Sequence, residues 1–325
     1  MWRAFETGPS VKSMVSKSNS SGSVPFLERA RYLRDLFLDY TAGAASADIA
    51  GLSEDFKRLD TYARSATKCE FAKLNAVEIG FGSKPYRIMY FCSRGVNAFG
   101  IDMDQPILKG SPAEFISIAR KNGWLRAIKS FVRYWLFERK ARLRFLDEIH
   151  TTVPDFVFDS KRLIVGDAGT PEPWSKIPVE PDLIYSIHVF EHIHPESLVW
   201  LLEFLHRRIR RNALLYIVIT IWTGLIGGHL IEWGRNHLAD KNKRSEPWEH
   251  LRRNRFPADT YLNKMTRRQY ASLFAKYFDV LQDKPVWSNL GKEYLTDAVK
   301  RELLQFDEYE LLSNDVCFVL RSKLT

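Results

Sequence analysis

Short apolar stretches recur along the chain, and segments of helical length separate them. Continuous apolar runs are typical of strands that are buried on both faces of a parallel sheet. Such runs alternating with helices predict an α/β fold, with a mostly parallel sheet covered by helices on both faces. The runs that predict strands are at about 75–79, 96–101, 162–166, 182–187, 213–220, 278–282 and 316–321.

The first part of the chain lacks such runs. Residues 1–24 are rich in Ser and Lys and have no apolar stretch, so we expect a disordered tail without a secretory signal. Apolar residues at helical spacing over 26–40 predict a first helix. Ser53 is expected to cap a second one. The chain therefore divides into a tail, an N-terminal helical cover over 25–70 and a main domain over 71–325.

Two connections in the main domain are longer than a simple crossover requires. Residues 105–161, between the second and third strands, predict a helical insertion. Residues 224–265 follow the fifth strand and predict a set of loops on the acceptor side of the sheet. Next, Thr266 and Gln269 form a capping box, which predicts a helix from there to about Phe278.

The charge of the chain is concentrated in the insertion. The net charge is +9, and residues 120–144 hold nine Lys or Arg against one acid, Glu138. A basic, aromatic-rich helix is compatible with a plain helical cap, with an anionic membrane surface or lipid-linked substrate, and with nucleic acid. No RNA-binding signature accompanies it, so nucleic acid ranks last. The aromatic residues among these cations are Trp124, Phe131, Tyr134, Trp135, Phe137 and Phe145.

The cysteines and the longest uncharged run indicate where in the cell the protein is expected. Cys69, Cys92 and Cys317 are odd in number and scattered, which favours a reducing compartment over a disulfide framework or a zinc knuckle. Residues 213–231 carry no charge, but their second half is rich in Gly and Thr, so we expect a strand and a loop rather than a membrane span. We expect a cytoplasmic protein, with contact to the inner face of the membrane through 120–144 as an addition.

The candidate chemistry begins at the ends of the first two predicted strands. Val77-Glu78-Ile79-Gly80-Phe81-Gly82 is an apolar strand that runs into two glycines, and Gly100-Ile101-Asp102-Met103 ends a second strand in a carboxylate. Ligands of open α/β sheets bind outside the carboxyl ends of the strands. Glycines there let the backbone approach a ligand closely, and the acid can hold a ribose diol. The pattern predicts a cofactor that contains adenosine.

These residues resemble the class I S-adenosylmethionine-dependent methyltransferases, whose first motif reads E/D-x-G-x-G-x-G. Lys84 stands at the third glycine of that motif. The dinucleotide motif G-x-G-x-x-G fits less well, because Pro85 takes its last glycine and Glu78 would lie near an anionic pyrophosphate. The sulfonium and ammonium of S-adenosylmethionine instead favour an acid.

Two later segments extend the resemblance. Residues 163–168 look like the family motif whose acid accepts a hydrogen bond from the adenine amino group, and residues 181–193 resemble its fourth-strand motif. The family inserts its seventh strand antiparallel, and 316–321 is placed to do so. The resemblance implies a seven-stranded Rossmann-like sheet and a set of cofactor-binding residues: Glu78, Gly80, Phe81, Gly82, Asp102, Met103, Asp167, Ala168, Ser186 and Ile187.

Histidines after the fourth and fifth strands are the candidate catalytic groups. We expect His229 to be the base that takes a proton from the acceptor, with His192 or His250 next, and Glu191 beside them. Residues 188–192 also fit the zinc motif H-x-x-E-H, which needs both histidines on one helical turn. Here the segment leads from a strand toward His194-Pro195, so we expect a metal-independent enzyme.

The leading hypothesis is methylation of an oxygen or nitrogen acceptor, and a sugar hydroxyl in a glycan or lipid-linked intermediate is the first candidate. Small aromatic and lipid acceptors remain open. Sugars stack on aromatic rings, for which Trp233 and Trp248 are the candidates. Residues 247–253 and 261–263 resemble acceptor loops of methyltransferases encoded with bacterial polysaccharide genes. Two alternatives remain: a catalytically silent methyltransferase-like module that binds a membrane surface or a partner, and a nicotinamide-dependent oxidoreductase.

Overall fold

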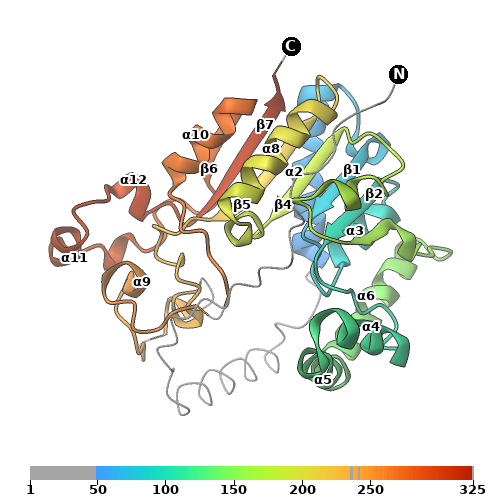
Figure 1. Cartoon of the computed structure of the whole chain (residues 1–325), viewed down its shortest axis with the longest axis horizontal. Coiled ribbons are helices and arrows are strands. Elements are labelled where there is room, and N and C mark those ends of the chain that lie inside the picture. The colour runs from blue at the N-terminus through green and yellow to red at the C-terminus, as the bar shows by residue number, and fades with distance from the viewer. Residues whose placement is uncertain (1–48, 235–236, 241, 259, 324–325) are drawn as a thin grey trace, which may run out of the picture. The chain divides into compact units, whose positions relative to one another are not determined.

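In the computed structural model, the described residues are 49–234, 237–240, 242–258 and 260–323. Within them, seven strands form one sheet in the order β3-β2-β1-β4-β5-β7-β6 (Figure 1). Each strand expected from the apolar pattern is present within a few residues of its predicted bounds. The strands are β1 (Asn75–Ile79), β2 (Asn97–Asp102), β3 (Leu163–Val165), β4 (Leu183–Ile187), β5 (Leu214–Thr220), β6 (Phe278–Pro285) and β7 (Asp315–Ser322).

The first five strands are parallel, and β1 lies between β2 and β4. The last strand, β7, runs antiparallel between β5 and β6. This arrangement confirms the expected class I methyltransferase fold, including its antiparallel seventh strand. Strands β2 and β3 extend the sheet on one side of β1, and β4 and β5 extend it on the other. The strand order therefore reverses between β1 and β4, and a ligand-binding crevice is expected at their carboxyl ends.

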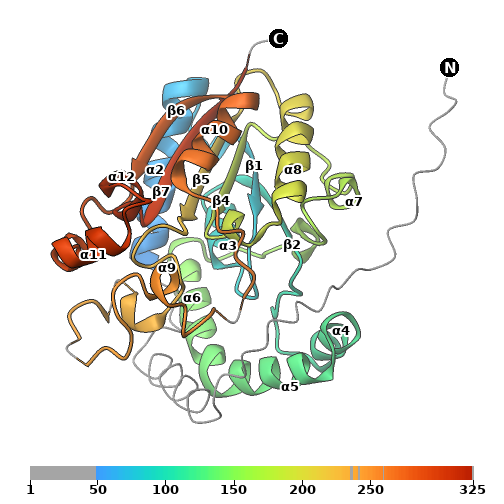
Figure 2. The ribbon, with the colours of Figure 1, turned by 60° about the vertical axis from the view of Figure 1, so that its left-hand side comes forward.

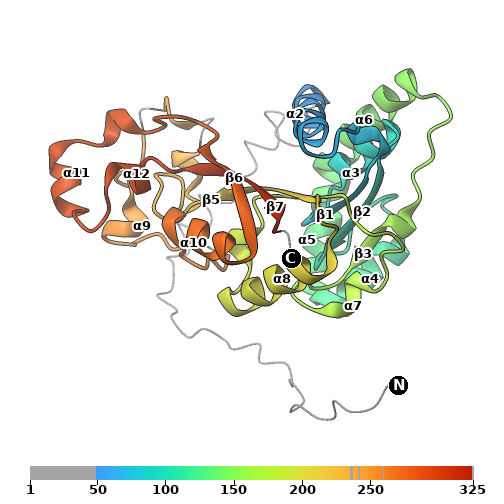
Figure 3. The same cartoon turned by 90° about the horizontal axis from the view of Figure 1, so that it is seen from above.

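Helices cover both faces of this sheet (Figure 3). One buried cluster joins the sheet to α8 and α10, and the other joins it to α2, α3 and α6. Residues alternate between the two faces along each strand, so both faces of β1 and β4 are apolar and buried. The bounds of these helices are α2 Ile49–Thr67, α3 Tyr86–Ser93, α6 Arg139–Thr152, α8 Pro195–Arg208 and α10 Arg267–Tyr277.

The expected insertion between β2 and β3 is helical. It contains α4 (Pro112–Asn122), α5 (Trp124–Arg133), a π-helical turn over Tyr134–Glu138 and α6. Ser111 and Glu114 form a capping box at the start of α4, and Gly123, at φ +90°, separates α4 from α5. These helices lie together at one end of the sheet (Figure 2).

Several local expectations are also resolved. The capping box of Thr266 and Gln269 opens α10, as predicted. Ser53 is not a helix cap, because α2 already includes Ile49 and Ser53 lies inside it. The helix expected over 26–40 and the tail over 1–24 lie outside the described residues.

The uncharged run over 213–231 forms β5 and a series of turns, as expected. Across the described ranges, every helix is too short or too polar to cross a bilayer.

A small third cluster was not foreseen. The loops over 224–265 pack against the segment between β6 and β7, which contains α11 (Asp297–Glu302) and α12 (Glu308–Leu311). The short helix α9 (Glu249–Arg252) belongs to the same region. The short helix α7 (Pro171–Trp174) follows β3. The cluster gives these loops an apolar base of their own, beside the main sheet.

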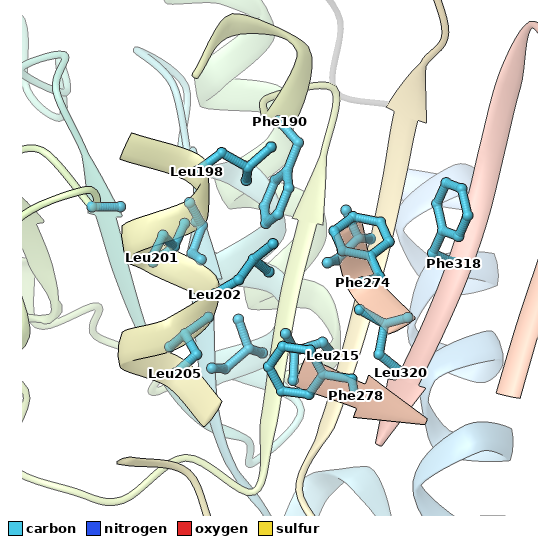
Figure 4. Packing of buried hydrophobic residues seen from close by; sticks show 14 of the residues in the cluster. Phe190, Leu198, Leu201, Leu202, Leu205, Leu215, Phe274, Phe278, Phe318 and Leu320 are labelled. Atoms are coloured by element: carbon cyan, nitrogen blue, oxygen red, sulfur yellow. The ribbon is translucent and has the colours of Figure 1, made fainter. Parts of the chain in front are cut away.

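We predict that Leu202→Ala lowers the free energy of unfolding by about 2–5 kcal/mol, because it opens a cavity where α8 packs on β5 and α10. Leu202 is fully buried among Leu198, Phe190 and Leu215 (Figure 4). Urea denaturation measures the change. Val199→Ala on the same helix is the control, since Val199 is exposed. Equal losses for the two variants would contradict the burial of Leu202 between α8, β5 and α10.

Candidate functional site

The glycines after β1 occupy backbone conformations that only glycine adopts readily. Gly80 has φ +87°, and an added Cβ there would lie 2.1 Å from Cγ2 of Val189 in the turn after β4. Gly82 has φ +64°, but an added Cβ would meet no atom within 4 Å. Gly80 is therefore required for packing, whereas Gly82 borders open space at the carboxyl edge of the sheet.

Asp102 ends β2 with both carboxylate oxygens held by backbone amides. The N–H of Gly82 donates to Oδ2 at 2.7 Å, and the N–H of Asp104 donates to Oδ1 at 2.6 Å. Burial raises the pKa of this carboxyl, and the two amide bonds oppose that rise. A carboxylate oxygen accepts more than one hydrogen bond, so Asp102 retains acceptor capacity for a diol. Met103, beside it, is 67% exposed and offers an apolar surface.

The other predicted cofactor residues divide into exposed and buried groups. Asp167 is exposed after β3, where its Oδ1 accepts the N–H of Gly169 at 2.8 Å. Ala168 is buried, and its carbonyl accepts the indole N–H of Trp174 at 2.9 Å. Its backbone N–H remains the group that the family motif assigns to the adenine ring.

Three more of the predicted cofactor-binding residues are packed into the protein. Ser186 is fully buried and donates to the carbonyl of Ile79, and Ile187 is half-buried beside it. The ring of Phe81 is buried against Gly100, where an added Cβ would lie 2.6 Å from Phe81 Cδ1. These residues shape the carboxyl edge of the sheet through their backbone and their packing.

Glu78 is turned into the protein rather than left open at the edge. It is 1% exposed; Oε1 accepts from Arg87 at 2.9 Å, and Oε2 accepts from the hydroxyl of Tyr185 at 3.3 Å. Burial raises the pKa of its carboxyl, and the guanidinium of Arg87 lowers it. Both oxygens have protein partners, so its contact with the cofactor stays a prediction.

The insertion forms a polar wall beside these strand ends. Arg126 of α5 donates to both oxygens of Asp104, at 2.8 and 2.9 Å, and Arg133 donates to Ser83 Oγ at 3.1 Å. Lys84, which replaces the third motif glycine, pairs with the buried Glu138 at 3.2 Å. A small polar cavity is lined by Ser83, Asp104, Arg126 and Arg133, among others.

Three of the four predicted catalytic side chains converge after β4 and β5. Glu191 and His192 lie on the 3-10 turn Phe190–His192, and His229 follows β5 at φ +54°. One N or O atom from each of the three lies within 4.8 Å of the other two. The two imidazole rings meet edge to face, with centroids 5.2 Å apart.

Burial controls the charge of this group. Glu191 is 3% exposed, and its Oε1 accepts a long hydrogen bond, 3.4 Å, from the N–H of Thr220. Burial raises the pKa of Glu191 to about 8. Burial and the neighbouring histidines lower the pKa of His229 to about 4, so its ring is neutral at neutral pH.

Asn263 and its neighbours fix the turn that carries Glu191 and His192. The side-chain amide of Asn263 donates to the carbonyls of Phe190 and Ile193, and its backbone N–H donates to the carbonyl of Glu191. Asn263 was expected in an acceptor loop, and this positioning role was not predicted. An Asn just before a predicted capping box was the only signal, and it is a weak one.

His250 does not join the cluster. Its Nε2 lies 2.7 Å from the carbonyl of Trp222, so this nitrogen carries the proton and donates. An added Cβ on Gly228 would lie 2.6 Å from His250 Cγ, which shows how closely the loop packs on the ring. Burial lowers the pKa of His250 to about 4. The structure thus gives His250 a packing role under the loop that carries His229.

The two tryptophans proposed for sugar stacking are buried in the protein and do not line an open surface. Trp233 and Trp248 are 3% and 0% exposed, and their indole N–H groups donate to Ser245 Oγ and the carbonyl of Leu311. That expectation was wrong, because both rings form the base of the third cluster. The sequence did not distinguish an apolar base from an open binding face.

His188 does not form the helical H-x-x-E-H arrangement with His192. It has φ +57°, lies directly after β4, and its Nδ1 is 3.0 Å from Thr220 Oγ1. His192 faces His229 from the following turn. The expected strand-to-helix turn is therefore confirmed for this segment.

No protein-family model matches the chain, and no curated protein matches its sequence. Its fold is similar to the PH0226 protein of Pyrococcus horikoshii OT3, at 13% identity over 83% of this chain and 91% of that one, with a TM-score of 0.39. It is similar to the 1,6-didemethyltoxoflavin-N1-methyltransferase of Burkholderia thailandensis, solved with S-adenosylhomocysteine, at 12% identity over 92% and 90%, with a TM-score of 0.39.

A third similar structure is the plantazolicin methyltransferase BamL, solved in complex with a triazolic desmethylPZN analog and SAH. The identity is 13% over 90% of this chain and 91% of that one, with a TM-score of 0.46. At this level of similarity, function has to be inferred from the side chains at the strand ends.

We predict that Arg87→Met destabilises the protein by about 3 kcal/mol at neutral pH, because it leaves Glu78 buried without its cation. The pKa of Glu78 then rises further, so protonation relieves the cost and the loss shrinks as the pH is lowered toward the ordinary carboxyl range. Urea denaturation across pH measures this. Arg94→Met, at the exposed end of the same helix, is the control. A pH-independent loss would contradict the ion pair.

Proposed function

We propose that the chain is a methyltransferase that uses S-adenosylmethionine to methylate an oxygen or nitrogen acceptor. The observation that carries the proposal is the pairing of two sites on one sheet edge. Asp102, fixed by the Gly82 amide, offers a diol-binding carboxylate at the end of β2. Glu191, His192 and His229 form a polar cluster at the ends of β4 and β5.

The two sites adjoin through β1 and β4. Val189, two residues before Glu191, packs on Gly80, two residues before Gly82. A cofactor held by Asp102 along the β1 turn would therefore present its methyl group toward the turn after β4. We propose backbone contacts from Gly80, Phe81, Gly82 and Ala168, an adenine contact from Asp167, and packing from Met103, Ser186 and Ile187.

The chemistry is an in-line displacement at the methyl carbon. The acceptor atom forms a bond to carbon as the carbon–sulfur bond breaks, and sulfur keeps the electron pair. The acceptor proton must leave, and neutral imidazole nitrogens are suited to accept its hydrogen bond. We propose that His192 and His229 meet the acceptor hydroxyl, with His229 the candidate base and His250 supporting the loop beneath it.

For the acceptor we propose a sugar hydroxyl, in a glycan or a lipid-linked intermediate. Tyr261 supplies an aromatic surface in place of the buried tryptophans. It is 41% exposed, and its ring stacks on that of His194 with the two centroids 3.9 Å apart. Its carbonyl lies 2.9 Å from His192 Nδ1, which ties this surface to the cluster. Trp222, with Lys264 over its ring at 5.2 Å, is a second half-buried aromatic nearby.

We predict that Asp102→Asn weakens binding of S-adenosylmethionine by about 10- to 150-fold, because each hydrogen bond to a charged group contributes about 1.5–3 kcal/mol. Isothermal titration of the full chain measures the affinity, and thermal unfolding checks that the variant is folded. Asp159→Asn, in the loop before β3, is the matched control.

Unchanged affinity in Asp102→Asn would overturn the cofactor assignment. Titration with NAD in place of S-adenosylmethionine tests the oxidoreductase alternative. Cofactor binding without any methyl transfer to a sugar, lipid-linked or small aromatic acceptor would favour the catalytically silent module.

We further propose that α5 and the turn after it contact an anionic membrane surface, where a lipid-linked acceptor would be found. Small or polar residues face the protein here, since Ala127 and Ser130 are buried. Exposed cations, Lys129, Lys140 and Arg144 among them, flank the outward apolar side chains. A helix with this division lies in a membrane interface. The exposed apolar residues of α5 and the turn are Trp124, Leu125, Ile128, Phe131, Val132, Trp135 and Leu136, and Leu143 follows on α6.

We predict that the full chain co-sediments with vesicles of anionic phospholipid, and that Leu125→Gln with Ile128→Gln weakens this at least about tenfold by removing apolar burial. Raised salt should weaken it as well. Val157→Gln, at an exposed apolar residue outside α5, is the control. Equal sedimentation of both variants, or equal binding to neutral vesicles at all salt concentrations, would contradict the proposal.

A further inference from the structure

Two buried polar atoms at the ends of β4 and β5 lack hydrogen-bond partners. Among the described residues, neither Glu191 Oε2 nor His229 Nε2 has one. An unpaired polar atom in the interior is costly, and the great majority of such atoms are paired. Glu191 has an oxygen atom and His229 a nitrogen atom that lie within 4.8 Å of each other and of a ring nitrogen of His192.

The hydrogen bond between His192 and Tyr261 determines which ring nitrogen of His192 can bind a metal ion. His192 Nδ1 lies 2.9 Å from the carbonyl of Tyr261. A carbonyl only accepts, so Nδ1 carries the proton and Nε2 has its lone pair available. A histidine that donates one N–H to a backbone carbonyl is oriented as metal-ligating histidines are.

The turn that carries two of these groups is held rigidly. Asn263 bonds three backbone carbonyls of the turn, as described above, and the hydroxyl of Tyr270 donates to Asn263 Oδ1 at 2.9 Å. Thr220 holds Glu191 from β5. The donor atoms of Glu191 and His192 are therefore positioned in advance by contacts from Asn263 and Thr220.

We propose that Glu191, His192 and His229 bind a divalent transition-metal ion. Two imidazole nitrogens and one carboxylate are a donor set suited to Zn²⁺, Fe²⁺, Co²⁺ or Mn²⁺. Ligands at about 2.0–2.2 Å from one ion are roughly 3–3.6 Å apart, so binding draws the present group, within 4.8 Å, together by about 1 Å. The cation also removes the cost of both unpaired atoms.

The ion's role would rest on the proposed function, whereas its binding would not. Three protein ligands leave coordination positions open for an acceptor hydroxyl. The bound hydroxyl would lose its proton to solvent water, and its oxygen would then attack the methyl carbon as the carbon–sulfur bond breaks toward sulfur. His229 would then act as a ligand instead of a base. This inference revises the expectation of a metal-independent enzyme.

Titration of the chelator-treated full chain with Co²⁺ tests the site, because its visible absorption reports the ligand set. We expect saturable binding, and Zn²⁺ should displace Co²⁺ in competition. Glu191→Gln and His229→Asn should each weaken binding by at least about 100-fold, since even loss of an outer partner of a ligand costs about 10- to 100-fold.

His150→Gln is the control, because His150 is an exposed imidazole on α6 and does not belong to the cluster. Thermal unfolding without metal checks that each variant is folded. Equal Co²⁺ affinity in the wild type, Glu191→Gln and His229→Asn would overturn the inference, as would equal losses in His150→Gln. Metal binding with no affinity for S-adenosylmethionine would instead leave the site standing and reject the methyltransferase.

Discussion

The approach of the β1 backbone to the turn after β4 sets the geometry of the carboxyl edge. Gly80 leaves no room for a side chain, because the methyl group of Val189 occupies that space. This contact joins the half of the sheet that ends in Asp102 to the half that ends in Glu191. The two polar sites therefore lie at the ends of strands that belong to one sheet edge.

The same edge gathers polar groups that a stable core would avoid. Most buried charges here are compensated: Glu78 by Arg87, and Glu138 by Lys84 and Arg133. Glu191 is the contrast: Oε1 has a long amide bond and a distant imidazole, His188 Nδ1 at 3.9 Å, and Oε2 has no hydrogen-bond partner among the described residues. Uncompensated burial at a strand end is typical of sites whose partner is a substrate or an ion.

The strands were predictable, because apolar runs of strand length report burial on both faces, and the family resemblance supplied the antiparallel seventh strand. Asp102 was predictable as a strand-end acid. The fates of Glu78 and Trp233 were not, because a sequence states residue type but not whether long-range packing buries it. The convergence of His192 and His229 required the spacing of β4 and β5, which no local pattern encodes.

The contact between Gly228 and His250 has a consequence for how this chain tolerates change. The backbone of one loop touches the imidazole of another, so the two positions constrain each other. A side chain at 228 would need a smaller residue at 250, and that residue would lose the hydrogen bond to Trp222. Natural or engineered variants of this loop should therefore carry paired substitutions, and single ones should be rare.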